Sequence, residues 1–179
     1  MARAKAQAAR LALPSALVVR FAPDYLLRAL KSPEFFLTQT TLASLKEDFQ
    51  FLDDWEERFK YVIELGRSLE PLAEAERTAA NKVQGCASQV WIATRTDNNG
   101  PQPVLRFTGD SDAILVRGLI AIAFLVYSGK TAAEIQASDA NTIFTELGLK
   151  DHLTPQRSNG LASMINRIRR DAAAARATS

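Results

Sequence analysis

The sequence predicts an α+β domain in which a small antiparallel sheet of about three strands packs against helices on one side. Apolar residues recur at helical spacing before residue 70 and after residue 113. Between these regions, residues 89–108 change to the short β-branched and aromatic runs typical of strands. The longest apolar run, residues 118–127, is half the ~20 residues that a membrane-spanning helix needs, which indicates a buried core helix.

Two helices are expected before the sheet. Thr41 precedes the first apolar stripe, and Asp53 and Asp54 precede the second helix, with acidic residues at capping-box offsets. The second helix is expected to bury one face, composed of Trp55, Phe59, Val62 and Ile63. Its charged residues are expected to form a solvated face, composed of Glu56, Glu57, Arg58 and Lys60.

A β-hairpin is expected next, with strands at residues 89–94 and 104–108 and a turn at residues 97–101. Residues 82–84 are the candidate third strand. Asp112 is expected to cap the buried helix that follows and also to touch the loop that carries Cys86.

Short helices are expected after the core helix. A capping box at residues 131–134 opens one of them, and Gly148 closes another. Breakers and caps should precede the final helix, namely Pro155, Ser158 and Asn159.

Length and charge limit the function classes. The 179 residues are 47% apolar, enough for one packed domain, and the net charge is only +2. Without a dense basic stripe, nucleic acid is not expected as a ligand, and no membrane segment is expected. Residues 1–40 carry no acid before Asp24, so they form an extension that is either an organellar transit peptide or an over-extended start, ahead of a domain at 41–179.

Cys86 is the only cysteine of the chain, and there is one histidine, His152. This count excludes an intrachain disulfide and a four-ligand zinc or iron–sulfur site, so no metal site is expected. Gly85 permits a positive φ, and small neighbours leave the sulfur accessible, which favours a reactive thiol on a turn; a buried, inert thiol is the alternative. Cysteine scarcity favours a reducing, cytoplasmic compartment, or an organelle if the extension is a transit peptide.

A family pattern appears in four ordered blocks: DWEERFKYVIELGR at 54–67, NKVQGCASQVW at 81–91, GDSDA with RGL at 109–119, and HLTPQRSNGL at 152–161. These blocks closely resemble the SufE family of sulfur-acceptor proteins, over about residues 41–170. The sequence departs from the family at Ala87, where many members carry glutamine, and in residues 1–40, which have no counterpart in a typical member.

The resemblance implies a fold related to the IscU scaffold and a role as a sulfur carrier. Cys86 would take the persulfide sulfur of a cysteine desulfurase, stimulate that enzyme and pass sulfur to an iron–sulfur scaffold complex. Pyridoxal phosphate would belong to the desulfurase, so no cofactor is expected on this chain. The resemblance also places the Arg157 motif near the cysteine loop, where its charge would stabilise a thiolate; capping of carbonyls is the alternative.

Other functions remain open from the sequence. A cysteine hydrolase would need His152 as its base, and a desulfurase-binding module would carry Cys86 incidentally. Gly85, Arg157 and Asp112 are the candidate supporting residues around the thiol. A homodimer is also compatible with the sequence.

Overall fold

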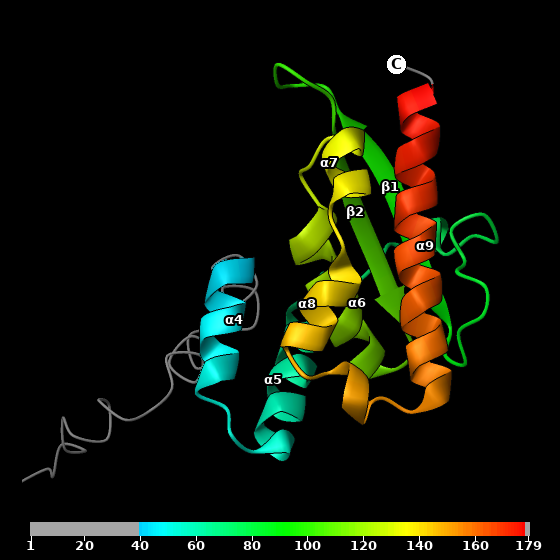
Figure 1. Cartoon of the computed structure of the whole chain (residues 1–179). Coiled ribbons are helices and arrows are strands. Elements are labelled where there is room, and N and C mark those ends of the chain that lie inside the picture. Colours follow the sequence, from blue (N-terminus) through cyan, green and yellow to red (C-terminus); the bar gives the residue numbers. More distant parts are fainter. Residues whose placement is uncertain (1–39, 178–179) are drawn as a thin grey trace, which may run out of the picture.

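The computed structural model describes residues 40–177, so the predicted extension at residues 1–40 lies almost entirely outside the described part. Four helices of the described residues are longer than eight residues, and the elements follow the chain in the order of Figure 1. They are α4 (Leu42–Gln50), α5 (Trp55–Ser68), β1 (Val90–Asp97), β2 (Val104–Ser111), α6 (Ile114–Tyr127), α7 (Ala132–Ala137), α8 (Ala140–Glu146) and α9 (Pro155–Ala177), with short 3-10 helices η1 (Glu74–Glu76) and η2 (Lys150–His152).

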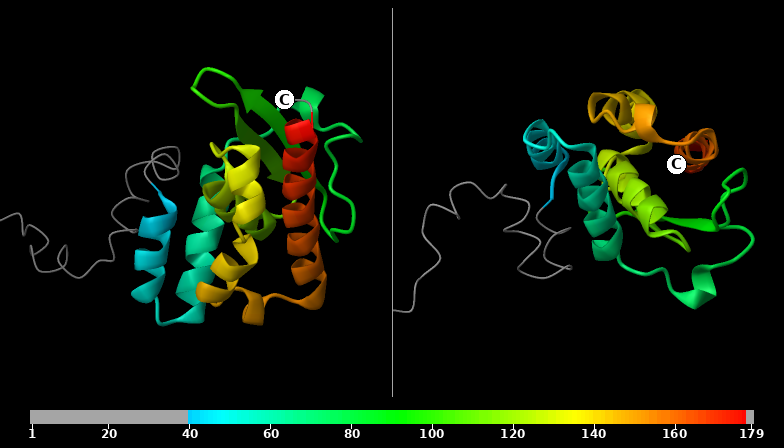
Figure 2. Two further views of the ribbon diagram at one scale, coloured as in Figure 1. Left: turned by 45° about the horizontal axis from the view of Figure 1, so that its top comes forward. Right: turned by 90° about the horizontal axis from the view of Figure 1, so that it is seen from below.

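Helix α6 forms the centre of the molecule. It packs against α5 on one side and against β2 and α9 on the other, with α4 outside α5 (Figure 2). Nine of its fourteen residues are buried, which confirms the predicted core helix. Two glycines let α5 and α6 approach closely: a Cβ on Gly118 would lie 2.0 Å from the Val62 carbonyl oxygen, and one on Gly66 would lie 2.4 Å from that of Ile114.

The sheet has two strands in the described region, fewer than the predicted three. Strands β1 and β2 pair antiparallel from Val90 opposite Ser111 to Asp97 opposite Val104. The candidate third strand, residues 82–84, makes only an isolated bridge from Lys82 to Trp91, because the chain turns away after two backbone hydrogen bonds to the edge of β1. Both paired strands extend beyond their predicted ends.

Helix boundaries follow several of the predicted caps. Asp54 accepts a hydrogen bond from the Glu56 amide at the start of α5, and the Thr131 capping box opens α7. Gly148 has a φ of +67° and follows Leu147, the C-cap of α8. The prediction for α9 was wrong at its start: the helix begins at Pro155, since proline suits the first helical position, and Ser158 and Asn159 lie inside it.

The predicted faces of α5 need correction. Its fully buried side is composed of Tyr61, Val62, Leu65 and Gly66, whereas Trp55, Phe59 and Ile63 are only half-buried. The close α5–α6 contact at Gly66 rotates this side inward. Arg58 is also only partly exposed: its guanidinium donates hydrogen bonds to the carbonyl oxygens of Leu52, Phe49 and Leu147.

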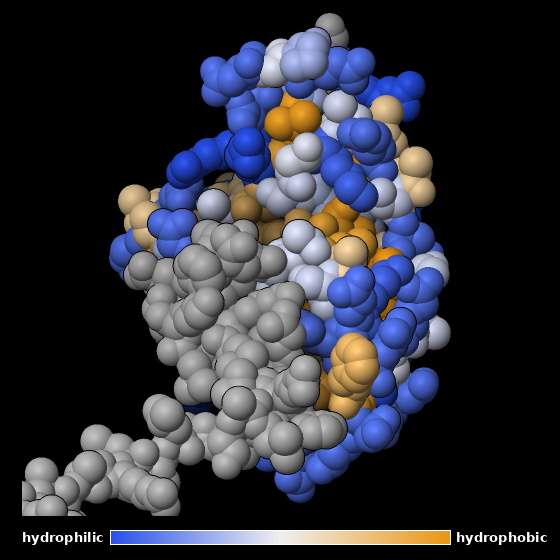
Figure 3. All heavy atoms as spheres, turned by 90° about the vertical axis from the view of Figure 1, so that its left-hand side faces the viewer, coloured by the Kyte–Doolittle hydropathy of each residue, from blue (hydrophilic) through white to orange (hydrophobic). Residues whose placement is uncertain are grey.

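Polar side chains prevail on the outer face that carries α4, with smaller apolar patches between them (Figure 3). Two large apolar side chains are exposed among residues 40–177: Phe51, at 73%, and Ile114, at 41%. No helix of this part of the chain is both long enough and apolar enough to cross a membrane.

Candidate functional site

Cys86 lies on a short loop that is fixed at both ends. On one side, the Val83 amide donates to the carbonyl oxygen of Val90 at 2.9 Å. On the other, the Gln89 amide donates to Oδ1 of Asp112 at 3.0 Å. The residues between these two anchors form the cysteine loop, residues 84–88. Hydrogen bonds of backbone amides therefore hold both ends of the loop in place.

Gly85 provides the backbone conformation of this loop. Its φ is +85°, a region that residues with a Cβ rarely adopt. A Cβ at this position would also lie 2.8 Å from Oγ of Ser163 in α9. Both the strain and the contact require glycine here, so the predicted turn is present and Gly85 directs the Cys86 side chain toward α9.

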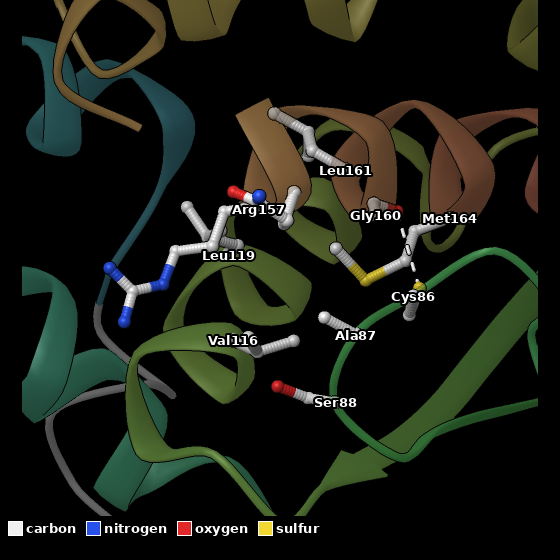
Figure 4. A pocket seen from close by; sticks show the side chains of 10 residues that line it. Cys86, Ala87, Ser88, Val116, Leu119, Arg157, Gly160, Leu161 and Met164 are labelled. Atoms are coloured by element: carbon white, nitrogen blue, oxygen red, sulfur yellow. Dashed lines mark hydrogen bonds between the residues drawn. The ribbon is translucent and has the colours of Figure 1, made fainter. Parts of the chain in front are cut away.

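The Cys86 side chain is half-buried against the first turns of α9. Its Sγ donates to the Gly160 carbonyl oxygen at 3.5 Å, a weak hydrogen bond. Beside the sulfur lies a cavity of about 20 Å³ (Figure 4). Most of its lining is apolar or backbone, contributed by Ala87, Ser88, Val116, Leu119, Gln156, Arg157, Gly160, Leu161 and Met164.

Burial raises the pKa of the Cys86 thiol above its ordinary value. Desolvation is the cause, because a thiolate loses hydration when it is enclosed by apolar side chains. The isolated protein therefore holds this group as a thiol near neutral pH. A thiol of this kind is protected from stray electrophiles and is a poor nucleophile until its surroundings change.

Arg157 lies at the cavity but does not direct its charge into it. Arg157 is one of the lining residues, whereas its guanidinium points away from Cys86 in Figure 4. Its amide donates to Oγ1 of Thr154 at the start of α9. In this conformation the guanidinium is not arranged to stabilise a thiolate.

Asp112 differs from its predicted role as a helix cap. The N-cap of α6 is Ala113, which makes no side-chain hydrogen bond, and the Asp112 carboxylate instead binds the Gln89 amide. The predicted proximity to the cysteine loop is thus present, through an anchor at the end of the loop.

Asp110 was not among the predicted site residues, yet it fixes the segment that leads to the loop. Its carboxylate is buried, pairs with Arg77 at 2.7 Å, and also pairs with Arg117. It further accepts hydrogen bonds from the amides of Leu72 and Ser111. The sequence block at 109–119 contained both Asp110 and Arg117, but only the fold shows that they meet Arg77.

His152, the candidate base of a hydrolase, is placed elsewhere. Its ring stacks on Trp55 with 3.5 Å between centroids, and it is exposed. It is not among the residues that line the Cys86 cavity. Within residues 40–177 there is also no group of three or more histidine, cysteine or acidic side chains that could hold a metal ion.

Comparison with known proteins identifies the domain. The model of the SufE family, described as an Fe-S metabolism associated domain, matches residues 43–172. The chain belongs to the SufE family. A SufE-like protein of Rhizobium etli, named as uncharacterized, is 55% identical over 136 residues, which cover 76% of this chain and 92% of that relative. Another, from Rhizobium meliloti, is 53% identical over 133 residues, covering 74% of this chain and 95% of the relative.

Membership of the SufE family confirms the resemblance seen in the four sequence blocks and agrees with the α+β fold. It supports a role in sulfur transfer for iron–sulfur metabolism, in a family that acts with cysteine desulfurases. The matched region contains the whole cysteine loop and most of α9.

Proposed function

We propose that this SufE-family chain carries sulfur as a persulfide on Cys86. It would accept that sulfur from a cysteine desulfurase, stimulate the enzyme's turnover and deliver the sulfur to an iron–sulfur scaffold complex. The observation that supports this best is the position of Cys86, on a glycine-containing loop and beside a small apolar cavity. The pyridoxal phosphate needed to release sulfur from cysteine belongs to the desulfurase in this proposal.

The transfer is a thiol–persulfide exchange. The Cys86 thiolate attacks the terminal sulfur of the donor persulfide, and the donor S–S bond breaks with its electron pair leaving on the donor cysteine. A persulfide forms on Cys86, and the donor thiolate takes up the proton that Cys86 lost. The exchange moves one sulfane sulfur and needs no external oxidant or reductant.

The raised pKa of Cys86 makes a change of surroundings part of this mechanism. In the isolated protein the sulfur is sheltered beside Val116 and Met164 and is mainly protonated. We expect the desulfurase to draw the cysteine loop out of the cavity and to supply a proton acceptor. Gly85 and the small residue Ala87 permit that movement between fixed ends.

Two alternatives make different demands on the same residues. A cysteine hydrolase needs a histidine base beside its nucleophile, whereas His152 stacks on Trp55 and is absent from the cavity lining. A binding module would stimulate the desulfurase without using Cys86. The described geometry favours neither alternative over the carrier.

Desulfurase turnover tests the proposal. Alanine formation from cysteine would be measured with the enzyme alone and with wild type, Cys86→Ser or His152→Ala added. If the protein is a carrier, wild type stimulates desulfurase turnover, Cys86→Ser does not, and His152→Ala retains most of the stimulation. Full stimulation by Cys86→Ser would favour the binding module, and loss of function in His152→Ala alone would favour the hydrolase.

The remaining assignments are part of the same proposal. We assign the protein to the cytoplasm because one cysteine in 179 residues suits a reducing compartment. The scaffold partner would be a SufBCD-like complex, and the desulfurase would be SufS-like. Homodimer formation remains a prediction that sedimentation of the free protein would check.

A further inference from the structure

Gly160 is a glycine in a place where helix stability disfavours one. It lies in the sixth position of the 23-residue helix α9 and is buried. Glycine inside a helix costs roughly 0.5–1 kcal/mol relative to alanine. Gly160 has no positive φ, in contrast to Gly85, Gly129 and Gly148, so its backbone conformation does not require glycine.

The thiol form of the protein does not require glycine at this position either. A Cβ on Gly160 would lie 3.4 Å from Sγ of Cys86 and 3.7 Å from its Cα and Cβ. These are ordinary van der Waals separations, which an alanine would tolerate. By contrast, a Cβ on Gly118 would clash with backbone at 2.0 Å, so steric exclusion explains that glycine but not Gly160.

The cavity supplies a reason for the glycine. Its volume of about 20 Å³ is bounded by both Cys86 and Gly160. A space of this size holds about one water-sized atom. A sulfane sulfur would extend the Cys86 side chain by one S–S bond of ~2.05 Å. A methyl group on Gly160 would compete with the sulfur for this space. The other walls are formed by the buried side chains of Val116, Leu119 and Met164, which already occupy the surrounding volume.

We propose that the cavity beside Cys86 holds one sulfane sulfur atom and that Gly160 is a specificity-determining residue that keeps this space open. The inference rests on the proposed function and deepens it, since it specifies a monosulfane cargo. The first added sulfur is enclosed by apolar side chains, whereas a second sulfur would extend beyond the cavity. Longer polysulfide chains on Cys86 would therefore be exposed to small nucleophiles.

The test loads Cys86 chemically, so its result does not depend on any desulfurase. The full-length protein is converted to the mixed disulfide with Ellman's reagent. Hydrosulfide then attacks the Cys86 sulfur, the aromatic thiolate leaves with the electron pair of the S–S bond, and a Cys86 persulfide remains. Cyanide removes the sulfane sulfur as thiocyanate and regenerates the thiolate, and thiocyanate formation gives the rate.

Gly160→Ala should lose its sulfane sulfur roughly fourfold faster than wild type. The factor assumes that the variant no longer buries the sulfane sulfur, which is about the size of one CH₂ group. The lost burial free energy is then ~0.8 kcal/mol, which converts to this change in rate. Gly100→Ala, at a position where the nearest atom to a new Cβ is 3.7 Å away, is the matched control and should behave as wild type. The thiol form of Gly160→Ala should unfold at the same temperature as wild type or higher. Equal cyanolysis rates for Gly160→Ala and wild type would overturn the proposal.

A second variant tests the size limit separately. Val116→Ala removes two carbons from the cavity wall and should admit a second sulfur. After treatment with inorganic polysulfide and brief exposure to a small thiol, intact mass should show one added sulfur on wild type and two on Val116→Ala. Two or more stable sulfurs on wild type would refute the one-atom limit. A protein that behaves as expected here but accepts nothing from a desulfurase would contradict the proposed function and leave this inference standing.

Discussion

Replacing Asp110 with asparagine should be among the most destabilising single changes in this domain. The carboxylate is buried, with 1% exposure, and accepts hydrogen bonds or ion pairs from Arg77, Arg117 and the amides of Leu72 and Ser111. Asparagine preserves the shape but removes the charge. Two arginines then remain at a site from which their counter-ion has been lost.

The expected loss follows from the burial of the two partners. Removing one partner of a buried ion pair costs about 3–5 kcal/mol. Arg117 is 16% exposed and should contribute most, whereas Arg77 is 35% exposed and is partly solvated after the change. We therefore expect about 3 kcal/mol. For a domain of about 140 residues, the unfolding entropy converts this loss to a fall in Tm of roughly 10 °C.

Differential scanning calorimetry at neutral pH measures this fall. Glu56→Gln is the matched control, because it also removes one acidic charge but breaks only an exposed pair with Lys60 at 4.0 Å. The control should lower Tm by no more than about 3 °C, because an acid in the first turn of a helix contributes about 0.3–1 kcal/mol. The reasoning would be refuted if Asp110→Asn unfolded at the same temperature as the control.

Three further predictions follow from the described contacts. Gly118→Ala should cost about 2–3 kcal/mol in urea unfolding, because its new Cβ meets the Val62 carbonyl oxygen; an unchanged midpoint would contradict this. Asp112→Ala should release one end of the cysteine loop and raise the rate of Cys86 alkylation by iodoacetamide about fivefold, from a hydrogen bond of ~1 kcal/mol, and an equal rate would argue against the anchor. Burial raises the folded pKa of Cys86, so the unfolded chain loses the thiol proton at a lower pH than the folded protein does. Above about pH 8.5, the unfolding free energy of wild type should therefore fall more steeply than that of Cys86→Ser, and parallel pH profiles would contradict the shift.

The sequence allowed much of the fold to be predicted because local signals agreed with the tertiary structure. The helix at residues 114–127 is so largely apolar that only a central position suits it, and the capping box at Thr131 is a local feature. The prediction of a third strand was wrong because three residues can pair with the edge of a sheet without forming a strand. The prediction of the buried face of α5 was wrong because a tertiary contact, that of Gly66 with α6, determines which side of the helix faces inward.

The sequence was enough to predict which residues form the site, but not the electrostatic surroundings of the Cys86 thiol. The motif around Cys86 and the positive φ at Gly85 follow from residue types that are local to the loop. The direction of the Arg157 side chain and the raised pKa of the thiol depend on how α9 packs over the loop, which sequence spacing does not specify. Gly160 was visible in a family block, but its contact with Cys86 spans 74 positions of sequence.

The central claim, that Cys86 accepts persulfide sulfur, is tested most directly by intact-protein mass spectrometry. Wild type and Cys86→Ser would each be incubated with an active cysteine desulfurase and cysteine, then measured without reductant. A gain of sulfur on wild type alone, reversed by a reducing agent, is the predicted result. No gain on wild type while the desulfurase remains active in the same tube, or an equal gain on Cys86→Ser, would contradict the account.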